Sequence, residues 1–151
     1  MALVIDRPFD ELEIGWKPGK SAGRTMTESD VVNFCMLTGN WLEIHANVEF
    51  CKEKAHYGQR VVQGSLVFSV IAGLAQFGPT VSAMYGVDKL RFITPVFIGD
   101  TIWIDPVVVR LKDKDEKHGV GTYSMNVINQ RDELVQSSEF SLLLRRTHPN
   151  A

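Results

Sequence analysis

The chain has 151 residues, of which 44% are hydrophobic and 23% charged, and its formal net charge is -2. This length and hydrophobic content predict a single domain over residues 1–151 with a substantial core, and they exclude a disordered or fibrous chain. The charge is nearly balanced and no run of basic residues occurs, so nucleic acid is not an expected partner.

No membrane segment, leader or metal site is predicted. The longest apolar-rich stretch, residues 61–77, is interrupted by polar side chains and is shorter than a membrane span. The N-terminal segment turns acidic at Asp6, unlike a signal peptide. Cys35 and Cys51 form no CxxC pair, which favours packed thiols in a reducing compartment. We therefore expect a cytoplasmic protein without a membrane partner, a metal ion or a cofactor.

The first part of the chain predicts an arm followed by a helix. Residues 1–20 are expected to be irregular, and residues 20–26 are expected to form a short strand. Thr27 can cap the amide of the residue three positions on, and acidic residues follow in the first turn, where the helix dipole favours them. Apolar residues then recur at helical spacing until Gly39, a typical C-terminal stop.

The middle of the chain predicts one short and one long helix. Residues 40–46 are expected to form a loop, residues 48–55 a short helix and residues 57–60 another loop. Residues 65–77 form the longest predicted helix, which ends at Gly78 and is apolar on nearly every side, so it should be buried. The small residues expected to let a sheet approach this helix are Ser69, Ala72, Gly73 and Ala75.

The remainder of the chain reads as strands. The predicted strands cover residues 81–93, 101–111, 120–129 and 134–145, and Pro106 marks a bulge or an edge position within the second. A buried helix followed by antiparallel strands predicts an α+β architecture. A helix that is apolar all round must be wrapped by a curved sheet, and this arrangement is the hot-dog fold.

Two features of the middle segment can carry chemistry. His45 lies in the predicted loop and can act as a general acid or base near neutral pH. Gly64 stands at the start of the long helix, where a bare backbone N–H and the positive end of the helix dipole can polarise a thioester carbonyl. Each of these signals is weak by itself, since a loop histidine is commonly structural and a glycine commonly serves a turn.

Three motifs carry a resemblance to a known family. Residues 38–45 read T-G-N-W-L-E-I-H, residues 62–66 read V-Q-G-S-L, and residues 91–101 read R-F-I-T-P-V-F-I-G-D-T. In order and spacing they resemble the S/T-G-D-x-N-P-x-H, V-H-G-M-L and F-x-x-P-V-x-x-G-D-T motifs of the MaoC-like (R)-specific enoyl-CoA hydratases. The resemblance runs from about residue 9 to residue 144.

The resemblance implies an acyl-thioester enzyme with the hot-dog fold. Members of this family hydrate trans-2-enoyl thioesters to (R)-3-hydroxyacyl thioesters or catalyse the reverse dehydration. An Asp and a His activate the water, a glycine amide binds the oxyanion, and a helix Ser supports the site. The family His, Gly and Ser correspond to His45, Gly64 and Ser69, whereas the family Asp corresponds to Asn40. Gln63 replaces the His before the glycine.

The change at Asn40 bears directly on catalysis. An asparagine can hold water by hydrogen bonds but cannot accept its proton at physiological pH. His45 can then be the base itself while Asn40 orients the water, or Glu43 can be a displaced carboxylate; both possibilities stay open.

Several other residues are candidates for binding the substrate. Trp41 can pack over an acyl channel, and Gln63 and Ser69 belong to the helix motif. Arg91, with Lys89, can meet the phosphates of CoA. The expected substrate is an acyl-CoA or acyl-carrier thioester.

Two further functions are compatible with these residues. The first is a non-catalytic acyl-binding subunit that pairs with a related active chain, which the change at Asn40 favours. The second is an acyl-CoA thioesterase, which would need Glu43 or Glu49 as its carboxylate. Hot-dog domains usually pair through sheet edges, so the resemblance implies a homodimer, or a heterodimer with a related chain.

Overall fold

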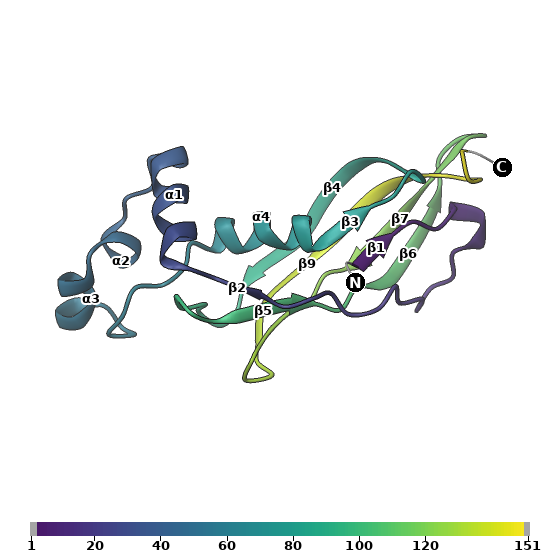
Figure 1. Cartoon of the computed structure of the whole chain (residues 1–151). Helices are drawn as coiled ribbons and strands as arrows, with labels where there is room; N and C mark the ends of the chain where they lie inside the picture. Colours follow the sequence, from purple (N-terminus) through teal and green to yellow (C-terminus); the bar gives the residue numbers. More distant parts are fainter. Residues whose placement is uncertain (1–2, 150–151) are drawn as a thin grey trace.

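The long C-terminal strand organises the sheet. In the computed structural model, which describes residues 3–149, β9 (Leu134–Arg145) has the predicted bounds. Its alternate residues face inward and are buried. It pairs on one side with β4 (Val81–Phe92), and on the other with β7 (His118–Ser124) and β8 (Val127–Asn129), all antiparallel. β9 is therefore the centre of a curved antiparallel sheet (Figure 1).

Two of the predicted strands are each broken in two. The stretch 101–111 divides at Pro106 into β5 (Thr101–Ile104) and β6 (Val107–Asp113), because proline has no N–H to donate to the ladder. The stretch 120–129 is likewise divided in two, into β7 and β8. The strand order is β2-β5-β8-β9-β7-β6, with β4 also on β9. The edge strand β2 (Arg24–Thr25) is shorter than predicted.

Helix α4 (Gly64–Leu74) packs its apolar side on this sheet (Figure 1). Leu66, Val67 and Ile71 are buried. Phe68 packs against Phe140 of β9 with ring centroids 5.5 Å apart, a separation typical of favourable aromatic pairs.

The prediction that the helix continues to residue 77 was wrong. Ala75–Phe77 form strand β3, which pairs in parallel with β1 (Leu3–Ile5), so the neighbouring strand supplies hydrogen bonds that the helix would otherwise provide. The expectation of a wholly irregular arm was wrong for the same reason at β1, and a 3-10 helix, η1, forms at Phe9–Glu11.

One side of α4 is open within the single chain. Ser65, Ser69 and Gly73 are exposed, at four-residue spacing along one face of the helix. The expectation that Ser69 and Gly73 lie against the sheet was therefore wrong, because the apolar side of the helix is turned to the sheet instead. Within one chain, the sheet therefore does not enclose α4 on all sides, in contrast to the prediction.

Three short helices lie together at the end of the molecule where α4 begins (Figure 1). They are α1 (Glu28–Thr38), α2 (Glu43–Ala46) and α3 (Val48–Lys54). Thr27 caps α1 in a capping box with Asp30, and Gly39 ends the helix with φ of 71°, as predicted. The prediction of a loop over residues 40–46 missed α2, whose single turn is held by backbone bonds to the carbonyl of Leu42.

Within residues 3–149, no helix has both the length and the apolar character needed to cross a bilayer. Cys35 and Cys51 are free and buried, as the cysteine pattern predicted.

Candidate active site

A pocket of about 270 Å³ opens beside the start of α4. It is formed by the segment around α2, the first turns of α4, the turn after β4 and the start of β9. Most of its lining is apolar; the lining residues are Ile44, His45, Tyr57, Val61, Val62, Gly64, Val67, Phe92, Ile93, Thr94, Pro95, Val96, Val135 and Gln136. His45 and Gly64, which belong to different predicted elements, thus line the same cavity.

A hydrogen bond selects the tautomer of the neutral His45 ring. Its Nδ1 lies 2.7 Å from the carbonyl oxygen of Val61, and only 7% of the residue is exposed. A carbonyl can only accept a hydrogen bond, so Nδ1 carries the proton in the neutral ring. Nε2 then has a free lone pair that can accept a proton. The backbone N–H of Val61 also donates to the carbonyl of Ile44, which ties the two segments together.

Gly64 is the first residue of α4, where a backbone N–H has no acceptor inside the helix. A Cβ at this position would lie 2.6 Å from the ring of Phe92, closer than side chains pack. Two residues before it, the N–H of Val62 donates to the carbonyl of Val96. A larger residue at position 64 would displace the ring of Phe92 from its present position. The amide of Gly64 stands at the positive end of the helix dipole.

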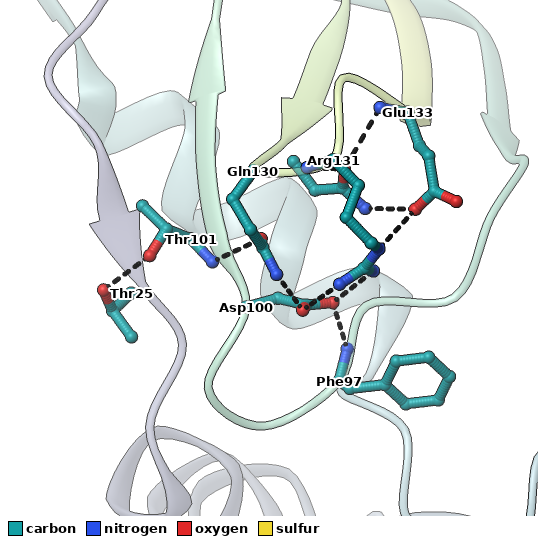
Figure 2. A network of polar contacts seen from close by, with 8 residues as sticks. Thr25, Phe97, Asp100, Thr101, Gln130, Arg131 and Glu133 are labelled. Atoms are coloured by element: carbon teal, nitrogen blue, oxygen red, sulfur yellow. Dashed lines mark hydrogen bonds and ion pairs between the residues drawn. The ribbon is translucent and has the colours of Figure 1, made fainter.

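A buried carboxylate network holds the turn that follows the pocket-lining residues 92–96 (Figure 2). Asp100 accepts hydrogen bonds from Arg131 at 2.9 and 3.2 Å, from Gln130 at 2.6 Å and from the N–H of Phe97 at 2.9 Å. Burial raises the pKa of Asp100, but these hydrogen bonds and the charge of Arg131 outweigh it and lower the pKa below its ordinary value. The network fixes the turn that brings Val96 to the pocket.

Gln136 is a pocket residue that the sequence interpretation missed. It lies on β9, is 1% exposed and lines the pocket. Its Nε2 donates to the carbonyl oxygen of Gly64 at 3.0 Å. The inward face of β9 otherwise continues with Ser138, Phe140 and Leu142, so a glutamine at an inward position of the alternating pattern was the available signal.

Other predicted site residues lie outside the pocket lining. Asn40 follows the C-terminal cap of α1 and is half-buried, while Trp41 beside it is half-exposed. Ser69 lies on the exposed side of α4 and donates to the carbonyl of Ser65. Arg91 is exposed and donates to the neighbouring Leu90 carbonyl. In the single chain, these side chains are not gathered around His45.

Gln63 is buried but faces helix α1. Its Nε2 contacts Sγ of Cys35 at 3.1 Å, and it does not line the pocket. This arrangement follows from α4's position beside α1, because adjacent residues at a helix start point to different sides.

The candidate carboxylates also lie elsewhere. Glu43 is exposed and accepts a hydrogen bond from Asn47, and Glu49 is exposed and pairs with Lys52. Neither lines the pocket. Lys89 pairs with Glu139 on the sheet. Across residues 3–149, no group of three or more His, Cys, Asp or Glu side chains is placed to hold a metal ion.

Sequence comparisons place these features in a known family. A family model described as "MaoC like domain" matches residues 10–129. The chain is 39% identical to Protein MaoC of Klebsiella aerogenes over 116 residues, which is 73% of this chain and 32% of that protein. It is 30% identical to 3-hydroxybutyryl-CoA dehydratase of Methylorubrum extorquens over 106 residues, 68% of this chain and 64% of that one. The chain thus spans less than two thirds of each of these relatives.

Solved structures agree on the fold. A monoamine oxidase regulatory protein from Archaeoglobus is 40% identical, with a TM-score of 0.86 and coverage of 97% of this chain and 99% of that one. A Mycobacterium tuberculosis protein with a double hot-dog fold has a TM-score of 0.83 at 24% identity, covering 96% of this chain and 46% of that one. The chain therefore has the hot-dog fold and belongs to the MaoC-like dehydratase family.

Proposed function

We propose that the chain hydrates trans-2-enoyl thioesters to (R)-3-hydroxyacyl thioesters and catalyses the reverse dehydration. One observation carries the proposal: a histidine with Nδ1 bound to a carbonyl and Nε2 free shares a pocket with the first amide of α4. The apolar side chains of Val62, Val67 and Val96 in that pocket suit an acyl chain. The relative named 3-hydroxybutyryl-CoA dehydratase is consistent with this substrate class.

In the proposed reaction each group performs one step. The thioester carbonyl accepts a hydrogen bond from the Gly64 N–H, which draws electrons from the conjugated double bond. Nε2 of His45 takes a proton from water as the water oxygen bonds to C3, and the double-bond electrons move to the carbonyl oxygen. The resulting enolate is protonated at C2 by the imidazolium of His45. One water is added, and His45 returns to its starting form.

The alternative functions differ in how well the site supports them. A thioesterase needs a carboxylate at the thioester, and Glu43 and Glu49 are both exposed and outside the pocket lining. A non-catalytic partner subunit is favoured by one observation, the asparagine at position 40.

Comparing the activity of the native protein with that of Asn40→Asp tests the proposed function. Because Asn40 is outside the pocket lining and His45 is the base, the native chain is expected to turn over crotonyl-CoA. Asn40→Asp should then gain much less than the roughly 10²–10⁴-fold that a general base supplies. The hydration rates are measured as the decrease in absorbance of the conjugated thioester. A native chain inert on short and long enoyl-CoAs, together with an active Asn40→Asp, would establish the partner-subunit function instead.

We also propose that two copies pair along β4. One edge of β4 pairs with β9, and no strand within residues 3–149 pairs with its other edge. Met84, Tyr85 and Phe92 along this strand are exposed apolar residues, and an open apolar edge is a natural site for strand addition. Beside it, the small residues on the open side of α4 allow a second helix to approach closely.

Sedimentation equilibrium measures this association. The native protein is expected to show twice the 16.9 kDa mass of one chain. Met84→Lys, which places a charge on the edge strand, should shift the mass toward the monomer. Ile14→Lys is the control, because it changes an exposed apolar residue outside β4. A native monomer at tens of micromolar protein would refute the homodimer.

A further inference from the structure

Gln136 lines the pocket and carries an unpaired buried acceptor. Its side chain is 1% exposed, and its Oε1 has no hydrogen-bond partner in the part of the chain that the structure describes. The orientation of the amide follows from chemistry, because the group 3.0 Å from the Gly64 carbonyl oxygen must be the donor, Nε2. Oε1 is therefore the end that is left for another donor.

An acceptor in this position is costly to keep. A buried polar atom without a partner is unfavourable, and such atoms in folded proteins usually have a specific cause. The walls around Gln136 are largely apolar. The neighbouring residues Val135 and Phe92 offer no side-chain donor, which leaves a water or a ligand hydroxyl in the pocket as the partner that fits.

We infer that Gln136 is a further binding residue of the site, and that its Oε1 accepts a hydrogen bond from the C3 hydroxyl of the bound (R)-3-hydroxyacyl thioester, or from the water that becomes it. The amide is anchored on the carbonyl of Gly64, the residue whose N–H is proposed to polarise the thioester carbonyl from which the acyl chain begins. His45, the proton acceptor, lines the same cavity. This inference rests on the proposed hydratase function.

The assignment also gives the water a second contact. Asn40, which stands at the family Asp position, lies outside the pocket lining. Gln136 cannot take a proton, but it can orient the hydroxyl while His45 moves the proton. A pocket built in this way prefers acyl chains with a hydroxyl near the carbonyl over saturated chains of the same length.

Binding of two ligands that differ only in the hydroxyl tests this inference. Calorimetry on a His45→Ala background, in which turnover is expected to be strongly slowed, compares (R)-3-hydroxybutyryl-CoA with butyryl-CoA. The hydroxylated ligand is expected to bind on the order of tenfold tighter, the size of one hydrogen bond. Adding Gln136→Met should remove this preference by weakening the hydroxylated ligand while butyryl-CoA keeps its affinity.

Gln63→Met is the matched control. Gln63 is also 1% exposed and also has an unpartnered Oε1 among the described residues, but it faces Cys35 and does not line the pocket. Its substitution should leave the preference intact. Equal affinities in the His45→Ala parent, or a preference that survives Gln136→Met, would overturn the inference. Turnover of crotonyl-CoA by the native chain is scored separately, so failure of the hydratase function is distinguishable from failure of the Gln136 assignment.

Discussion

Replacing His45 with alanine is expected to lower kcat for enoyl-thioester hydration by roughly 10²–10⁴-fold. The ring is the only imidazole or carboxylate among the described lining residues of the pocket, and Nδ1 donates to the Val61 carbonyl, which leaves the lone pair of the neutral ring on Nε2. The loss should appear mainly in kcat, since the apolar lining that binds the acyl chain stays in place. Initial rates on crotonyl-CoA across a substrate range measure both parameters.

His45→Asn separates catalysis from folding. The amide nitrogen of asparagine can occupy the place of Nδ1 and keep the hydrogen bond to the Val61 carbonyl, but it has no counterpart of Nε2. We expect this variant to melt near the native temperature and to lose activity as His45→Ala does. A His45→Asn protein with native kcat would show that the base lies elsewhere.

Replacing Asp100 with asparagine is expected to destabilise the protein by about 1.5–3 kcal/mol at pH 7, the value of a buried hydrogen bond to a charged group. Both carboxylate oxygens accept hydrogen bonds, so an amide turns one acceptor into a donor that faces other donors. Asp100 is 5% exposed, and water cannot compensate. Urea unfolding followed by circular dichroism gives the difference in free energy.

The pH dependence of that difference has a defined sign. Because the pKa of Asp100 is lowered in the folded state, its stabilisation is complete above the ordinary carboxyl value of 3.8. It is lost as the pH falls through the lowered pKa. The gap between native and Asp100→Asn should therefore be constant at neutral pH and narrow below about pH 4. Asp88→Asn, an exposed change on β4, controls for net charge; a gap that widens in acid would contradict the assignment.

The parts of the fold that could be predicted were those with an unbroken local pattern. No proline or glycine interrupts β9, which was predicted with its bounds, and the cap of α1 follows from Thr27 and Gly39. The end of α4 was missed because β1, distant in the sequence, pairs with Ala75–Phe77. Long-range pairing overrides local helix preference, and no local pattern reveals it.

The sequence motifs predicted two residues of the candidate site but not the residue that β9 contributes. His45 and Gly64 were identified, and the structure brings them to one pocket. Gln136 lies far from both along the sequence, after most of the strands, and it belongs to none of the motifs. Only the register of β9 in the folded sheet shows that it reaches Gly64. Asn40 belongs to the first motif, yet it is outside the pocket lining of the single chain.

We propose that this chain is itself a hydratase despite the asparagine at position 40. The test is the rate of crotonyl-CoA hydration with the purified native chain as the only protein, with chiral analysis of the product. Sustained turnover to (R)-3-hydroxybutyryl-CoA is expected. No turnover by the native chain alone, with activity appearing only when a related chain that keeps the Asp is added, would contradict it.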